Sequence, residues 1–192
     1  PPAIADNQAG DDAWRRADPG AVYDVDFNDA GGSKLDSIQY TAWTGPGQSG
    51  VNKIAWTDIA APPVNLDSFT ANWAVNFALL EQGTNYISVR AWDKAGSTTT
   101  VNDVFYVKKD NALPGITDNQ AGDDAWRNSN TGVYNVDFAD AGSLLEKAEV
   151  KITTGIAQTG TLIADWTAVL PAINSASYSS DWPLTSGLWS LL

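Results

Sequence analysis

The feature that most constrains the fold of this chain is a string of ten residues, DNQAGDDAWR, that occurs twice. It spans Asp6–Arg15 and returns letter for letter as Asp118–Arg127, a displacement of 118 − 6 = 112 residues. The likeness continues beyond the string, because GAVYDVDFNDAGGSKL at 20–35 returns as GVYNVDFADAGSLL at 132–145. A period of about 110 residues is too long for one turn of a solenoid and matches the size of a whole domain.

The repeat predicts two domains, residues 1–112 and residues 113–192. The boundary follows the polar stretch Lys108–Asn111 and falls just before Leu113-Pro114, where proline fixes its own φ and keeps the preceding residue extended. The formal charge is the same in both domains, 8 − 14 = −6 for the first and 3 − 9 = −6 for the second. Neither domain is therefore a specialised charged tail.

Alternating apolar and polar residues predict β-strands in the first domain. Val22–Phe27 places Tyr23, Val25 and Phe27 on one face and its aspartates on the other. Tyr86–Trp92 also alternates, and Asp103–Val107 is rich in β-branched and aromatic residues. Only Ala74–Leu80 has the character of a short helical turn. About seven short strands in about 110 residues predict an all-β fold, with a Greek-key β-sandwich in each domain.

The end of the first domain carries a resemblance to a known family. The segment YISVRAWDKAG at 86–96 is followed by a threonine-rich strand and by Val-Lys-Lys-Asp at 107–110. This resembles the bacterial immunoglobulin-like and fibronectin-III-like tandem repeats of large cell-surface proteins, in which an Asp-x-Ala-Gly-Asn turn precedes the last strand. Ser97 stands where that pattern has asparagine. The resemblance implies tandem immunoglobulin-like sandwiches in an extracellular or cell-surface protein.

The second domain is expected to lack its last two strands. It ends near the counterparts of Gln82 and Gly83, so nothing corresponds to Tyr86–Trp92 and Thr98–Val107. Three explanations stay open: the sequence stops inside a longer array, another subunit completes the sandwich, or the domain is a shortened form. An open sandwich exposes apolar core and unpaired strand edges, which invites strand addition from another chain.

Composition excludes several classes of function. The chain has no cysteine and no histidine, which removes Ser-His-Asp and Cys-His catalysis and zinc sites built on either residue. A formal net charge of −12 disfavours binding to nucleic acid and to anionic membrane surfaces. No apolar run is long enough for membrane insertion.

Aspartates gather near the start of each domain and before the domain boundary. Calcium takes about six to eight oxygen ligands from carboxylates and carbonyls. One hypothesis is therefore that calcium ions bind at the junction between domains and stiffen it. The candidate ligands are Asp6, Asp11, Asp12, Asp93, Asp110, Asp118, Asp123 and Asp124. The alternative is that these aspartates form turns and are otherwise solvated.

Nine tryptophans are many for this length. Three of them, Trp14, Trp56 and Trp73, recur as Trp126, Trp166 and Trp182, which favours packing in the core or between strands. Trp43 and Trp92 do not follow this pattern, so they are the candidates for contact with a sugar or another ligand. Two carboxylates are enough to hydrolyse a glycosidic bond, so Asp24 and Asp26 are considered as a catalytic pair. The second copy has Asn135 in place of Asp24, which favours the alternative that these side chains only form the solvent-exposed face of a strand.

These observations predict a non-enzymatic extracellular structural repeat protein, such as a stalk, surface-layer, filament or adhesin-spacer segment. Its expected partners are neighbouring repeats or copies of itself, and calcium is the one cofactor considered. The alternative function is a binding module that recognises a glycan or a host or cell-surface protein through exposed aromatic side chains.

Overall fold

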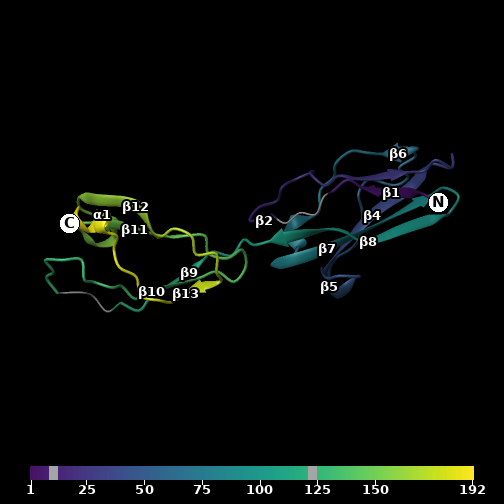
Figure 1. Ribbon diagram of the computed structural model, residues 1–192. Helices are drawn as coiled ribbons and strands as arrows, with labels where there is room; N and C mark the ends of the chain where they lie inside the picture. Colours follow the sequence, from purple (N-terminus) through teal and green to yellow (C-terminus); the bar gives the residue numbers. More distant parts are fainter. Residues whose placement is uncertain (9–12, 121–124) are drawn as a thin grey trace. The chain divides into compact units, whose positions relative to one another are not determined.

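The chain is an all-β protein. The computed structural model describes residues 1–8, 13–120 and 125–192 (Figure 1). Strands account for 47% of it and helices for 5%, which confirms the all-β prediction. The chain divides into two compact units, Pro1–Asn111 (unit 1) and Ala112–Leu192 (unit 2), whereas the sequence placed the boundary one residue later.

Unit 1 contains two sheets. Its elements are β1 (Ala3–Asp6), β2 (Trp14–Arg15), β3 (Val25–Asn28), β4 (Leu35–Gly45), β5 (Ser49–Asp58), β6 (Ser68–Phe69), the 3-10 turn η1 (Phe77–Leu79), β7 (Gly83–Asp93) and β8 (Thr98–Lys109). One sheet has the order β1-β3-β6, and the other has the order β2-β8-β7-β4-β5. Neighbouring strands are antiparallel except β2, which runs parallel to β8.

The core of unit 1 takes side chains from both sheets. Alternation along β4 and β7 buries one face of each strand, so that Tyr40 and Val89 pair on the inner side. Four aromatic rings meet there: Tyr23 stacks on Phe105 with ring centroids 4.7 Å apart, and Trp73 lies 5.3 Å from Tyr40 and 5.7 Å from Phe105. These contacts join the strand that follows Tyr23 to the larger sheet.

Unit 2 repeats the early part of this arrangement. Its elements are β9 (Gly115–Asp118), β10 (Val136–Ala139), β11 (Ala148–Thr153), the 3-10 turn η2 (Ile156–Gln158), β12 (Leu162–Leu170), β13 (Ser177–Tyr178) and the short helix α1 (Ser186–Trp189). The sheets have the orders β13-β10-β9 and β11-β12. The predicted likeness extends to single hydrogen bonds, since Tyr23 pairs with Trp73 as Tyr134 pairs with Trp182.

Strands β7 and β8 have no counterpart among the described residues of unit 2. The first consequence is exposure: Tyr23, Val25 and Phe27 are buried, whereas Tyr134, Val136 and Phe138, which follow the same local path, are only partly buried. The second concerns the repeated Trp-Arg pair. Trp14 and Arg15 form β2 on β8, whereas Trp126 is fully exposed outside any strand.

The end of β8 packs against the turn η1 in unit 1. Lys108 and Lys109, which begin the polar stretch before the domain boundary, are the last residues of β8, and the Lys109 side chain is buried. The Lys109 ammonium group donates to the carbonyl oxygens of Phe77 at 3.1 Å and Leu80 at 2.8 Å, next to η1. The expected helical turn at Ala74–Leu80 is confirmed as η1, which spans three residues of that segment.

Candidate functional site

The first three residues of the repeated string form a hydrogen-bonded latch on β3. The Asp6 carboxylate accepts from the Gln8 backbone N–H at 2.8 Å, which turns the chain after β1. The Asn7 side-chain amide donates to Asp26 at 2.9 Å, and the Gln8 side-chain oxygen accepts from the Asp24 backbone N–H at 3.1 Å. The Asp6 and Gln8 side chains therefore bind backbone N–H groups, and the Asn7 side chain ties the segment to the side chains of Asp24 and Asp26.

Unit 2 forms the same latch with the same geometry. Asp118 accepts from the Gln120 backbone N–H at 2.8 Å, Asn119 donates to Asp137 at 2.9 Å, and Gln120 accepts from the Asn135 backbone N–H at 2.9 Å. Asn135 stands where unit 1 has an aspartate, and its side-chain oxygen still accepts from Asn119 at 3.3 Å. The position needs an oxygen acceptor rather than an acid.

We expect Asn7→Ala and Asn119→Ala each to weaken the latch by about 1 kcal/mol, because each removes a side-chain hydrogen bond that holds two chain segments together. Faster amide hydrogen exchange in β1 or β9 would measure the loss. Asp24→Asn is the matched control, since unit 2 already carries asparagine there, and its exchange should stay at the parent rate. Unchanged exchange in the Asn7→Ala variant would refute the role of the latch.

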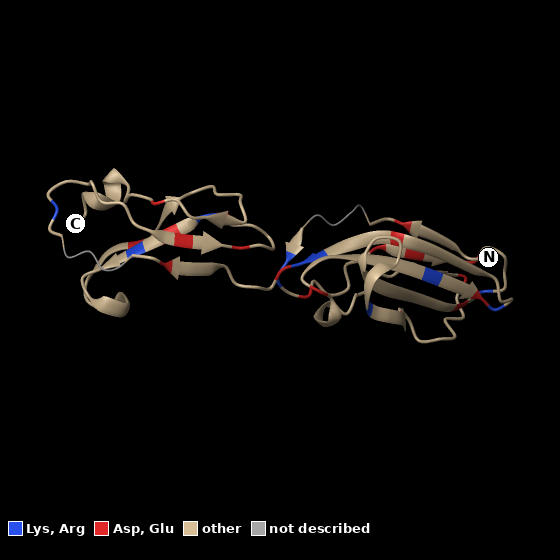
Figure 2. Cartoon of the chain, turned by 90° about the horizontal axis from the view of Figure 1, so that it is seen from below, with Lys and Arg blue, Asp and Glu red and all other residues tan. Residues whose placement is uncertain are grey.

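The predicted calcium ligands do not all come together. Asp11, Asp12, Asp123 and Asp124 lie outside the described residues. Asp6 and Asp118 are exposed and hold the latch turns. Figure 2 shows acidic residues spread over the strands and turns of each unit. Within residues 1–8, 13–120 and 125–192, no group of three or more acidic residues is placed to hold a metal ion.

The calcium hypothesis also requires the Asp93 turn and Asp110 to converge at a domain junction, and within unit 1 they do not. Asp93 ends β7, and Gly83 at the other end of β7 pairs with Lys109, the neighbour of Asp110. The two aspartates therefore lie about 93 − 83 = 10 residues apart along the sheet, or about 33 Å. Asp93 instead accepts from the Ser97 backbone N–H at 2.8 Å and so closes the β7–β8 turn.

Shifted pKa values have local causes. The Ser33 hydroxyl, which donates to Asp29 at 2.8 Å, lowers the pKa of the Asp29 carboxyl. The hydrogen bond from Lys53 lowers the pKa of Glu81, and burial lowers the pKa of Arg90. These groups belong to separate turns and pairs and do not form an acid–base constellation.

Trp43 and Trp92 lie on the outer face of the five-stranded sheet but not in one site. Trp43 pairs with Tyr86, and Trp92 is 92 − 86 = 6 residues further along β7, which is about 20 Å. Trp92 belongs to a stack in which the Arg90 guanidinium lies 4.4 Å from its ring and 4.1 Å from that of Trp56. The expected contact residues therefore fall into two groups.

An aromatic band runs across the strands from Trp43. Tyr86 lies opposite Trp43, Tyr106 lies opposite Tyr86 with ring centroids 6.5 Å apart, and the Lys108 ammonium group lies 5.7 Å from the rings of both Tyr106 and Trp14. We call these five residues the aromatic band. Sequence reasoning found only Trp43, because the others are placed beside it by strand pairing.

Only one of the three repeated tryptophan pairs lies in a core. Trp73 and Trp182 are 4% and 7% exposed, and their indole N–H groups donate to the carbonyl oxygens of Val25 and Val136. Trp14 and Trp56 pack between strands on the outer face of the sheet, beside Lys108 and Arg90. Trp126 and Trp166 are exposed, so the expectation is wrong for these two copies. Recurrence marked a shared position and not a shared environment.

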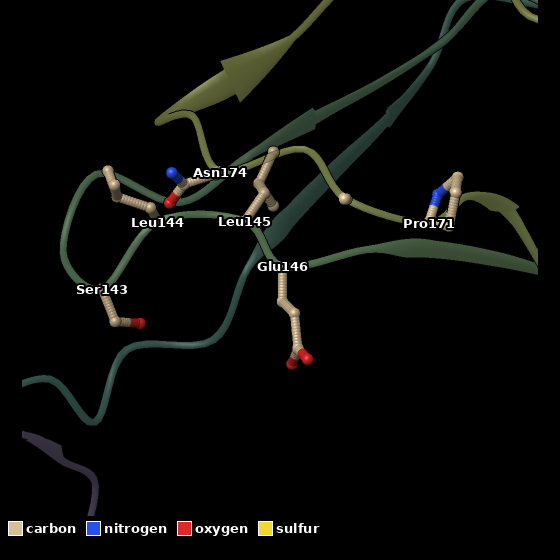
Figure 3. A pocket seen from close by; sticks show the side chains of 7 residues that line it. Ser143, Leu144, Leu145, Glu146, Pro171 and Asn174 are labelled. Carbon is tan, nitrogen blue, oxygen red and sulfur yellow. The ribbon is translucent and has the colours of Figure 1, made fainter.

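A shallow hollow in unit 2 was not expected from the sequence. Its lining consists of Ser143, Leu144, Leu145, Glu146, Pro171, Ala172 and Asn174 (Figure 3). Glu146 is its one acidic residue, and Figure 3 shows the Glu146 carboxylate pointing away from Asn174. The lining therefore holds no carboxylate pair.

Comparison with known proteins adds no relative. No protein-family model, no curated protein and no solved structure matches the chain. Among the described residues, no helix has the length and apolar character required to cross a bilayer.

Proposed function

We propose that this chain is a non-enzymatic structural repeat protein of the cell surface or extracellular space, built from tandem immunoglobulin-like β-sandwiches of Greek-key order. It would serve as a stalk, surface-layer, filament or adhesin-spacer segment of the kind found in bacterial surface proteins. Its partners are neighbouring repeats or copies of itself.

The observation that carries this proposal is the recurrence of the latch. The repeated residues Asp6, Asn7 and Gln8 make hydrogen bonds that hold the segment after β1 beside Asp24 and Asp26, and their copies make the same bonds in unit 2. A chain that duplicates fold-forming contacts gains length and mechanical continuity, which is the usual benefit of tandem repeats. The exchange of Asp24 for Asn135 with its contact kept also supports a structural role.

Electron microscopy of the native material tests the proposal. Regular fibres or lattices are expected, and dispersed single particles at high protein concentration would contradict it.

Calcium is a separate part of the proposal, resting on the aspartates of the repeated string. A calcium titration followed by thermal unfolding should raise the midpoint if these residues bind the ion only in the folded state.

The aromatic band favours a second candidate function, the binding of an extended glycan. Flat aromatic rings stack on the apolar faces of sugars, and the band presents such rings on adjacent strands of one sheet face. Glycan-array binding that is lost in Trp43→Ala would support this function. Trp92→Ala tests the stack with Arg90 separately, and Trp166→Ala, at an exposed position of unit 2, is the control that should keep binding.

A further inference from the structure

The outer face of the five-stranded sheet in unit 1 carries a cation packed against two indole rings. The Arg90 guanidinium group lies 4.1 Å from the Trp56 ring and 4.4 Å from the Trp92 ring. Arg90 and Trp92 belong to β7, and Trp56 belongs to β5, the last strand in the order of that sheet. All three side chains are half-buried. We call these three residues the arginine stack.

A glutamine on β4 fixes one edge of the guanidinium group. The Gln39 side-chain oxygen accepts from Arg90 Nε at 3.0 Å and from Nη2 at 2.7 Å. The Gln39 side-chain nitrogen donates to the Asp58 carboxylate at 2.6 Å, which sets the end of the amide that faces Arg90. The guanidinium group is therefore held in one orientation by the rings and by this amide.

The edge of the guanidinium group formed by Nη1 and Nη2 stays free for another acceptor. A guanidinium group has five N–H donors, and the bonds to Gln39 use one on Nε and one on Nη2. The two donors on Nη1 and the second donor on Nη2 make no hydrogen bond to a described residue. Two parallel N–H groups on one edge match the two oxygens of a carboxylate.

The charge of Arg90 also has no acidic partner in the described part of the chain. Arg90 forms no ion pair with a described residue, and Asp58 is joined to it only through the Gln39 amide. Burial lowers the pKa of Arg90, because the guanidinium group has lost part of its hydration. A partly desolvated cation without a counter-ion is costly, so an anion bound at its free edge would be stabilising.

Short hydroxyl side chains border the arginine stack on the next strand. Thr100 of β8 lies opposite Arg90, and Thr98 lies opposite Trp92. Both threonines are exposed, so their hydroxyl groups are accessible to a ligand beside the stack. A ligand that matches this surface carries a carboxylate, apolar ring carbons and hydroxyl groups. An acidic sugar has all three, whereas an acidic peptide has only the carboxylate.

We propose that the arginine stack binds the carboxylate of an acidic glycan, a polysaccharide that contains uronic acid residues. The carboxylate accepts from the free edge of Arg90, the indole rings contact the carbons of the sugar ring, and the threonine hydroxyls bind sugar hydroxyls. The inference rests on glycan binding, the second candidate function, and adds the class of glycan. Arg90 then determines specificity, since the rings of the aromatic band accept neutral and acidic sugars alike.

Tetragalacturonate and its methyl ester, each titrated into the full chain by calorimetry, test the proposal. The two probes share their sugar rings, but the ester has no charge. The acid should bind at least about ten-fold more tightly than the ester. Equal affinities, or no binding of the acid at about 1 mM, would overturn the proposal. Tetraglutamate that binds as tightly as the acid would also overturn it, by assigning the stack to acidic peptides. Neutral glycans bound on the array would still support the second candidate function.

Two variants place the effect at Arg90. Arg90→Met keeps an unbranched stem against the rings but has no donors, so the preference for the acid should disappear. Gln39→Glu gives Arg90 an internal carboxylate and should weaken binding of the acid at least about ten-fold. Lys147→Met, at an exposed position of unit 2, changes the net charge as Arg90→Met does and should keep the preference.

Thermal unfolding shows whether each variant is folded. A full preference for the acid in either folded variant contradicts the proposal, and Gln39→Glu decides alone if Arg90→Met does not fold.

Discussion

Trp73→Ala is expected to lower the free energy of unfolding of unit 1 by about 3–5 kcal/mol, a large fraction of the stability of a small domain. The Trp73 ring lies within 6.1 Å of Tyr23 and closer to Tyr40 and Phe105, so its removal leaves a cavity where the two sheets meet. Urea unfolding monitored by hydrogen exchange in β3, β4 and β7 measures the loss for unit 1 by itself.

Trp182→Ala is the matched control for this prediction. The Trp182 ring lies 5.6 Å from Tyr134 and 6.5 Å from Phe138, and both partners are only partly buried. Because the removed ring has fewer buried neighbours, we expect a smaller loss in unit 2, about 1–2 kcal/mol. Equal losses in the two units would show that the covering strands β7 and β8 do not account for the difference in their cores.

Lys109→Met is expected to destabilise unit 1 by about 2–4 kcal/mol although it replaces a charged side chain with an apolar one of similar length. The ammonium group of Lys109 is buried and donates to three carbonyl oxygens, those of Phe77, Ala78 and Leu80. Methionine fills the space but donates no hydrogen bond, so these buried oxygens lose a donor. Thermal unfolding and exchange in β7 and β8 give the measurement.

Lys108→Met is the control, because the neighbouring lysine lies on the outer face within reach of the Trp14 and Tyr106 rings. We expect a loss below about 1 kcal/mol there, the size of a surface cation–π contact. If the two substitutions destabilise unit 1 to the same degree, the buried contacts of Lys109 do not stabilise the turn η1.

Local patterns in the sequence predicted the strands well. Val22–Phe27, Tyr86–Trp92 and Asp103–Val107 lie in or beside β3, β7 and β8. The reason is physical: successive side chains of an extended chain point to opposite faces whichever strand lies alongside. The exact repeat then carried the pattern to unit 2, where the latch residues Asp118, Asn119 and Gln120 make the expected copy of the first turn.

Predictions that depended on pairing between distant strands were the ones that failed. Asp93 and Asp110 are close in the order of strands but lie at opposite ends of one hairpin. Lys109 stands in a polar stretch of the sequence, and only the approach of η1 accounts for the burial of its side chain. Of the aromatic band, the sequence predicted only Trp43 as a contact residue. The register of β4, β7 and β8 sets which rings become neighbours, and the sequence pattern does not contain that register.

The sequence by itself determined the strands, the turns between them and the duplication of the fold. Tertiary structure alone decided which of the duplicated side chains are covered. Tyr23 and Tyr134 sit in matching local segments and bridge to matching tryptophans, yet one is buried and the other only partly so. Burial depends on strands that hydrogen-bond from far along the chain, and β7 and β8 provide this cover in unit 1.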